Sequence, residues 1–263
     1  MRDLLHSAEE NAQALIAAAH GARLEGAFTA PRRAEHGDLC ASHALVSASR
    51  LGIAPASLAR RLARRIDLDG SFFSSVAAAG AGFLNFTLGD AWYSAVLDEA
   101  ARLGAPTAAL AQPETALDVL MLFPHAADVP ERELCRRGDM ANPVYRVRYA
   151  YARMGAVMEN RATSAHPAQA ADVSRLVRGE ERALIRLIAA LPRSCARAEE
   201  RGGAAALCAY ALNLADGFYA VYAVPQYFSA DERTLAQRLR LLDAARRALG
   251  YALDCAGINK SMI

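Results

Sequence analysis

The stretch Asn142–Glu159, NPVYRVRYAYARMGAVME, decides how the second half of this 263-residue chain folds. Asn142-Pro143 predicts the start of a helix, because proline fits the first turn, where its missing N–H has no partner within the helix. One predicted helix stripe is apolar enough for a core: Val144, Val147, Tyr151, Met154 and Met158. A second stripe gathers aromatic and guanidinium groups on one face: Tyr145, Arg148, Tyr149, Ala152, Arg153 and Ala156.

A helix face of tyrosine and arginine can stack on nucleic-acid bases and hold phosphates. The same residues are also compatible with ordinary half-buried positions in a helical bundle. Composition alone leaves both interpretations open.

Charge favours the first interpretation. The net charge is only +2, but from Asn142 onward 17 Arg and Lys stand against 11 Asp and Glu. The positive surplus therefore lies in the C-terminal part, which indicates a polyanionic partner. Only one of the basic residues is a lysine, Lys260, so chemistry that needs a lysine has a single candidate.

The composition indicates a folded protein of a reducing compartment. Apolar residues make up 54% of the chain. The five cysteines are scattered, without a C-x-x-C pair, which argues against disulfides and thiolate zinc sites. No secretion signal is visible at the N-terminus. Residues 70–89 are uncharged over a membrane-like length, but their periodicity is that of strands. We expect a cytoplasmic protein with no membrane contact and no cofactor.

No enzyme motif is recognisable. The spacing of His36, Asp38, Cys40 and His43 does not converge on one side of a helix or a strand, so we expect no metal site there. Phosphate-binding loops, nucleophile elbows and zinc-protease motifs are missing from the sequence. We therefore name no catalytic residue.

The first hundred residues predict helices followed by two strands. Residues 3–20 form an amphipathic helix, and Asp38 is expected to cap a second helix with Leu45, Ala48 and Leu51 inward. The helix after Pro55 should bury its leucines and expose its arginines. That exposed face is either solvated or a contact for RNA. Its residues are Arg60, Arg61, Arg64 and Arg65.

Strands are predicted at Phe72–Ala79 and Phe83–Leu88, joined by a glycine turn. The second strand alternates, so Leu84, Phe86 and Leu88 should face a core. The opposite face carries Phe83, Asn85 and Thr87. An aromatic ring beside an amide can read a splayed-out base, or it can simply belong to an exposed strand. A helix should then begin at Asp90 and continue to about Arg102.

Residues 104–140 contain four prolines and predict a connector. Helical periodicity then covers residues 142–161, 172–191, 193–201, 204–223 and 230–256. The predicted fold is an α+β domain over residues 1–103, with a small antiparallel sheet and helices. An all-α helical bundle over residues 141–263 follows the connector.

Two sequence patterns resemble arginyl-tRNA synthetases. His36-Gly37-Asp38-Leu39 with Gly80-Ala81-Gly82-Phe83-Leu84-Asn85-Phe86 is similar to the N-terminal additional domain of that family, which runs HGDYATN and then GPGFINF. The opening stretch is similar to NPVYYVQYAHAR, which begins the family's DALR-type anticodon-binding domain. Tyr151 stands where the family has His, Arg148 where it has Gln, and Ile263 extends past the family's terminal Met.

The resemblance implies roles for particular residues. In the family the additional domain reads the D-loop of tRNA, which points to Phe83 and Asn85. The helical domain holds the anticodon loop. The implied residues there are Tyr145, Arg148, Tyr149, Arg153, Tyr219, Tyr222 and Met262.

The large departure lies between the two resembling parts. In the family a class I nucleotide-binding domain with HIGH and KMSKS sequences occupies that place, whereas here it holds the connector, which is too short for such a domain. We therefore expect no aminoacylation. The first hypothesis is a non-catalytic tRNA- or RNA-binding protein, with tRNA(Arg) as a candidate. The second is a regulatory module that docks a protein partner without RNA.

Overall fold

The computed structural model describes residues 1–31, 33–125, 129–161, 164–165 and 172–261. The chain divides into two compact units. The first is Leu4–Ala95, and the second combines Met1–Asp3 with Val96–Ile263. The division falls inside helix α4 (Asp90–Ala101), which the sequence predicted. The predicted domain boundaries after residues 103 and 140 stay a prediction.

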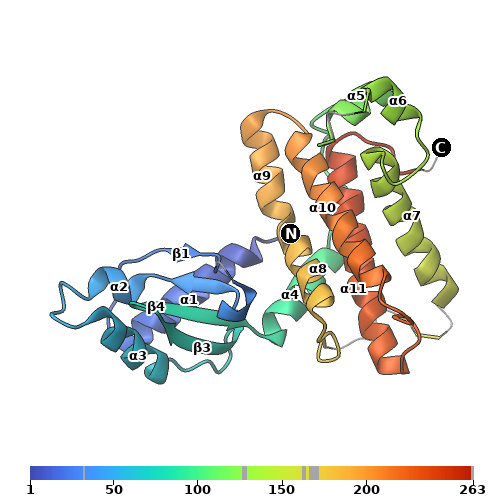
Figure 1. Ribbon diagram of the computed structural model, residues 1–263. Coiled ribbons are helices and arrows are strands. Elements are labelled where there is room, and N and C mark those ends of the chain that lie inside the picture. Colours follow the sequence, from blue (N-terminus) through green and yellow to red (C-terminus); the bar gives the residue numbers. More distant parts are fainter. Residues whose placement is uncertain (32, 126–128, 162–163, 166–171, 262–263) are drawn as a thin grey trace. The chain divides into compact units, whose positions relative to one another are not determined.

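The first unit contains a four-stranded antiparallel sheet in the order β1-β2-β4-β3 (Figure 1). The small antiparallel sheet expected near the N-terminus is therefore confirmed. Its strands are β1 (Phe28–Thr29), β2 (Leu39–Ala41), β3 (Phe73–Ala79) and β4 (Phe83–Leu88). β1 and β2 were not predicted, because two or three residues are too few to show a period of two.

Strand β4 is central and alternates as predicted. Leu84, Phe86 and Leu88 are buried, and the residues between them are half-buried. The Phe86 ring packs 4.9 Å from that of Phe73 on β3, measured between centroids. Burying three such side chains on one face fixes the register, since a slip of one residue would turn all three outward.

Besides the first half of α4, the described part of this unit contains α1 (Leu4–His20), η1 (Ala34–His36), α2 (His43–Ser47) and α3 (Pro55–Arg65). α1 buries Leu4, Ala8, Ala12, Ile16 and Ala19, as its periodicity predicts. α3 buries Leu58 and Leu62 and exposes its four arginines, which confirms that prediction too.

The prediction for Asp38 was wrong. Asp38 caps no helix: its N–H donates to the Phe86 carbonyl oxygen at 2.8 Å, and its carboxylate accepts from the Leu88 N–H at 2.9 Å. The chain enters strand β2 directly after it, and α2 is only five residues long. Leu45 and Leu51 are consequently exposed rather than inward, although Ala48 is buried.

Gly37 explains why the chain can bind β4 in this way. Its φ is +84°, and a Cβ atom there would lie 2.6 Å from the Phe86 carbonyl oxygen. Only glycine fits such a close backbone approach at positive φ without strain. The local His-Gly-Asp sequence thus serves strand docking.

All regular secondary structure in the described part of the second unit is helical. Its five longer helices are α7 (Pro143–Arg161), α8 (Gly179–Ala189), α9 (Leu191–Arg201), α10 (Ala205–Tyr222) and α11 (Glu232–Cys255). All five were predicted, but α8 begins seven residues later than its periodicity suggested. The residues before it form turns, and Gln237 of α11 accepts a hydrogen bond from the Arg175 N–H at 2.7 Å.

Helix α10 is the centre of this unit, since it packs against α7, α8, α9 and α11. It buries large side chains on several sides: Leu207, Tyr210, Leu214, Phe218 and Val221. A helix that is apolar nearly all round belongs inside a bundle. The predicted all-α bundle is therefore confirmed.

The segment 104–140 holds two short helices, α5 (Ala116–Met121) and α6 (Glu131–Arg136). Thr115 and Asp118 form a reciprocal capping box at the start of α5. Leu120, Phe123 and Leu134 are buried. α5 contacts α6 and α7, so this segment packs against the helical bundle as part of the second unit.

A buried ion pair joins α8 to α11. Glu181 has a fully buried side chain and accepts from Arg238 Nε at 3.1 Å and from the Arg178 N–H at 2.9 Å. The Arg238 guanidinium lies 4.2 Å from the centroid of the Tyr227 ring. Both charges are thus held by several partners in a place that water scarcely reaches.

Removing one partner should be costly. We expect Glu181→Ala to lower the free energy of unfolding by about 3–5 kcal/mol, because it leaves a buried guanidinium without its carboxylate. Asp243→Ala, which breaks the exposed pair with Arg247, should cost less than about 1 kcal/mol. Urea unfolding of both variants measures the difference, and equal losses would contradict this account of the pair.

Candidate nucleic-acid interface

Helix α7 begins and is oriented as the sequence predicts. Asn142 caps it, with its side-chain oxygen accepting from the N–H groups of Val144 at 2.9 Å and Tyr145 at 3.3 Å. The buried stripe contains the predicted Val144, Val147 and Met154, to which Ala150 and Gly155 are added. Tyr151 and Met158 are half-buried.

Three tyrosines come together where α7 meets α10. The rings of Tyr145 and Tyr149 are stacked, with centroids 5.9 Å apart and planes 16° from parallel. The Tyr219 hydroxyl of α10 donates to the carbonyl oxygen of Arg146 at 2.7 Å. All three rings are half-buried. They form an aromatic surface with one side still open to solvent.

Arg153 continues this surface toward the end of α10. Its Nε donates to the Tyr222 hydroxyl at 2.8 Å, and its guanidinium carbon lies 5.2 Å from the Tyr222 ring centroid. The hydrogen bond to Tyr222 raises the pKa of Arg153 above its ordinary value. The guanidinium is thus charged and fixed in direction while remaining half-buried.

Arg146 holds the two helices in this arrangement. Its Nε donates to the Asp216 carboxylate of α10 at 2.8 Å, and a second nitrogen contacts the same oxygen. The Arg146 side chain thus binds Asp216, and its backbone carbonyl accepts from the Tyr219 hydroxyl, so both attach this turn of α7 to α10. We call Tyr145, Tyr149, Arg153, Tyr219 and Tyr222 the α7–α10 surface.

Arg148 stands apart from the other predicted residues of α7. Its Nε donates to the Asn259 carbonyl oxygen at 2.8 Å, so it points toward the C-terminal segment rather than toward α10. Burial lowers the pKa of its guanidinium. The structure therefore brings five of the predicted residues together and places Arg148 beside a different feature.

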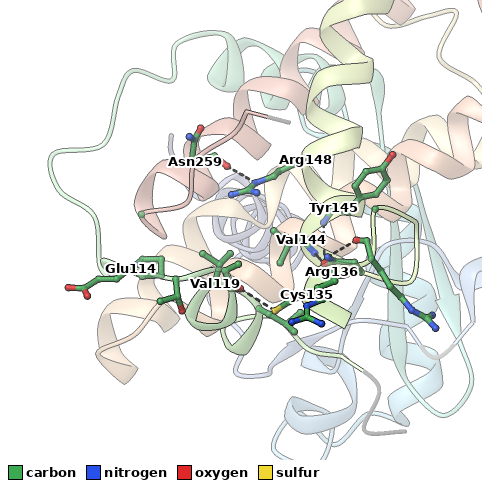
Figure 2. Close-up of a pocket in the computed structure, with 16 residues that line it drawn as sticks. Glu114, Val119, Cys135, Arg136, Val144, Tyr145, Arg148 and Asn259 are labelled. Carbon is green, nitrogen blue, oxygen red and sulfur yellow. Dashed lines mark hydrogen bonds between the residues drawn. The ribbon is translucent and has the colours of Figure 1, made fainter. Parts of the chain in front are cut away.

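That feature is a cavity of about 500 Å³ in the second unit. Arg148 and Asn259 lie on one side of it, and Val119 and Cys135, from α5 and α6, lie on the other (Figure 2). Sequence reasoning missed it, because its second wall comes from residues 113–138, which read as a connector. The capping box at Thr115 and Asp118 was the local signal that this segment is ordered.

Phe83 and Asn85 belong to the first unit. Both are half-buried on the face of β4 opposite the core. Asn85 pairs with Cys40 on β2 and with Ala77 on β3, and Cys40 pairs with Thr29 on β1. The cross-strand neighbours of Asn85 are thus small, whereas its same-face neighbours along β4 are Phe83 and Thr87. Met262, the remaining predicted residue, lies outside the described residues.

The described residues contain no group of three or more His, Cys, Asp or Glu that could hold a metal ion. His43, one of the residues tested for metal binding above, is buried, and its Nε2 lies 2.7 Å from Gln13 Oε1. In the part of the chain that is described, no helix is both long and apolar enough to span a bilayer.

Comparison with known sequence families matches both parts of the chain. Residues 7–88 match the family described as arginyl tRNA synthetase N terminal domain, and residues 147–261 match the DALR anticodon binding domain. The chain is arginyl-tRNA synthetase-like in both parts. The two matches leave residues 89–146 between them, and no catalytic domain is matched there.

Individual arginine–tRNA ligases are also similar to this chain, over about half of its length. The arginine–tRNA ligase of Nitratidesulfovibrio vulgaris is 35% identical over 132 residues, which are 48% of this chain and 24% of that protein. The arginine–tRNA ligase of Thiobacillus denitrificans is 34% identical over 126 residues, 48% of this chain and 22% of its own length. The matches thus span about a quarter of these relatives.

Among solved structures, the arginyl-tRNA synthetase of Thermus thermophilus has a similar fold. The TM-score is 0.55 at 12% identity, with 96% of this chain and 99% of that chain covered. The recognition of synthetase-like domains from the two quoted patterns is therefore confirmed, as is the predicted fold class.

The Tyr219 hydroxyl of the α7–α10 surface makes the free energy of unfolding depend on pH in the alkaline range. Burial, followed by the neighbouring Tyr149, raises the pKa of Tyr219 above the ordinary value of about 10. A raised folded-state pKa stabilises the fold below the pKa of the unfolded tyrosine, and this contribution is lost as pH rises above it.

We expect the free energy of unfolding to fall above about pH 10, and Tyr219→Phe to reduce the steepness of that fall. At neutral pH the same variant should cost about 1 kcal/mol through the lost bond to Arg146. Urea unfolding between pH 7 and 11 tests both. An unchanged alkaline slope in the variant would show that Tyr219 ionises as freely as in the unfolded chain.

Proposed function

We propose that this chain is a non-catalytic tRNA-binding protein of the cytoplasm that contacts the anticodon loop with its second unit and the D-loop or elbow with its first. The observation that carries the proposal is the α7–α10 surface: four tyrosine rings and a fixed guanidinium lie together, all but Tyr145 inside the part that matches an anticodon-binding domain. tRNA(Arg) is the ligand that the similarity to arginine–tRNA ligases favours.

The chemistry of this surface suits single-stranded loop nucleotides. Unstacked bases bind aromatic rings, and each such contact is worth about 1–3 kcal/mol. The Tyr145 and Tyr149 rings are already stacked on each other, so little side-chain freedom remains to be lost on binding. Arg153 supplies a cation beside them, held by Tyr222, and no carboxylate among the described residues pairs with it.

The first unit offers a second contact. Asn85 lies half-buried on the face of β4 opposite the core, with Phe83 two residues earlier on the same face. An amide both donates and accepts hydrogen bonds, so it can read a base edge while the ring stacks on the base. Met262 and Arg148 are included as further candidates for the anticodon loop.

The proposal leaves out aminoacylation. The family matches cover an N-terminal domain and an anticodon-binding domain, and residues 89–146 between them contain α4, two short helices and loops. A nucleotide-binding catalytic domain needs far more chain than this. For the two matched parts we therefore propose RNA binding without aminoacylation.

A first test is the binding of tRNA(Arg) to variants of the α7–α10 surface, measured by filter binding from 50 to 300 mM salt. We expect Tyr149→Ala to weaken binding about tenfold, by loss of one stacking contact. Arg153→Glu should weaken it at least as much and lower the salt slope by about one. Arg201→Glu, an exposed charge reversal at the end of α9, is the matched control and should change the affinity less than threefold.

The outcome against the proposal is equally definite. Wild-type affinity for tRNA(Arg) no better than for random RNA of the same length would exclude specific tRNA recognition. Loss of affinity in Arg201→Glu equal to that in Arg153→Glu would show that only the net charge matters.

A second test concerns the sheet face. Asn85→Ala should weaken binding of full-length tRNA about tenfold, but leave binding of an isolated anticodon stem-loop unchanged, because Asn85 is proposed to contact a different part of the tRNA. Gel-shift titration with both RNAs measures this. An equal loss for the two RNAs would contradict the assignment of Asn85 to the D-loop or elbow.

A further inference from the structure

The half-buried Arg148 lacks an acidic partner among the described residues. Its Nε donates a hydrogen bond to the backbone carbonyl oxygen of Asn259. Two other half-buried arginines of this unit face carboxylates, Arg146 with Asp216 and Arg238 with Glu181, whereas Arg153 donates to the Tyr222 hydroxyl. A guanidinium that is partly withdrawn from water without an opposite charge is unfavourable unless an anion joins it.

Arg148 lies at the wall of the cavity described above, and two further arginines share that wall. Arg136 is exposed at the end of α6, and Arg137, which follows it, pairs with Glu133 at 3.2 Å. Against these three guanidinium groups the lining contains one carboxylate, Glu114. Because Glu133 pairs with Arg137, the positive charge of the cavity comes from Arg148 and Arg136. A planar guanidinium is well suited to the oxygens of a phosphate.

The remaining wall is apolar and aromatic. Val119, Leu120 and Val144 line it, and the Tyr145 ring lies at its edge (Figure 2). A volume of about 500 Å³ is within the range of sites that enclose a small organic ligand, roughly 300–1,000 Å³. An apolar wall with one aromatic ring accepts a flat ring system, while the arginines accept its charge.

We propose that this cavity binds one nucleotide, with the phosphate held by Arg148 and Arg136 and the base against Tyr145 and the valines. The nucleotide is either a free mononucleotide or one residue of a bound RNA, and for the second source the inference rests on the proposed function. The α5–α6 segment is then a binding element in its own right.

The test is isothermal titration calorimetry of the full chain with the four nucleoside 5′-monophosphates and the corresponding nucleosides at low salt. We expect a monophosphate to bind at least tenfold more tightly than its nucleoside, because charged hydrogen bonds to phosphate dominate. Arg148→Gln, which keeps a donor for Asn259 but loses the charge, should weaken monophosphate binding about tenfold, and Arg148→Lys should restore part of it. Arg136→Gln should weaken it severalfold.

Arg132→Gln is the matched control, since Arg132 is exposed on the same short helix α6 but does not line the cavity. It should bind like the wild type. No heat of binding with any monophosphate at millimolar concentration, or equal binding of nucleoside and monophosphate, would overturn the proposal. So would equal losses in Arg132→Gln and Arg136→Gln.

A competition experiment separates the two sources and the two proposals. Monophosphate that displaces tRNA identifies a residue of RNA as the occupant, and monophosphate that binds without displacing tRNA identifies a free nucleotide. Tight tRNA binding without any monophosphate binding overturns the cavity proposal and leaves the proposed function standing. Monophosphate binding by a chain that does not bind tRNA supports the cavity proposal, with a free nucleotide as the occupant, and overturns the proposed function.

Discussion

The burial of one stripe of α7 is the constraint on which the rest of the second unit depends. Val144, Val147, Ala150 and Met154 are buried in the bundle, where α7 packs against α10 and α11. A helix turns 100° per residue, so burying this stripe determines where every other side chain of α7 points. Tyr145, Tyr149 and Arg153 are consequently directed to the side of α10 and to solvent.

The same constraint explains why three of the four arginines of α7 have different partners. Arg146 joins α7 to α10 through Asp216, Arg153 is positioned by Tyr222, and Arg148 reaches the C-terminal segment at Asn259. Arg146 therefore joins two helices, Arg153 belongs to the aromatic surface, and Arg148 lines the cavity. The residue type is the same in all three cases, so the position of each guanidinium is determined by the partner that it contacts.

Much of this could be predicted from the sequence, where periodic patterns were long. α7, α11 and β4 were predicted because each presents a regular apolar face over several turns or residues. β1 and β2 are too short for a pattern, and Asp38 reads as a helix cap because only the folded sheet places Phe86 and Leu88 beside it. The cavity could not be predicted, since Gly257 and Asn259 in its lining follow the other lining residues by more than 100 positions, and since the segment 104–140 is rich in proline.

The central claim is that the two synthetase-like units contact two separate parts of one tRNA, and footprinting measures this most directly. Hydroxyl-radical footprinting of tRNA(Arg) bound to the full chain should show protection in the anticodon loop and, separately, in the D-loop or elbow. Tyr149→Ala should weaken the first protection and Asn85→Ala the second. Protection spread evenly over the tRNA backbone, or confined to the acceptor stem, would contradict the account.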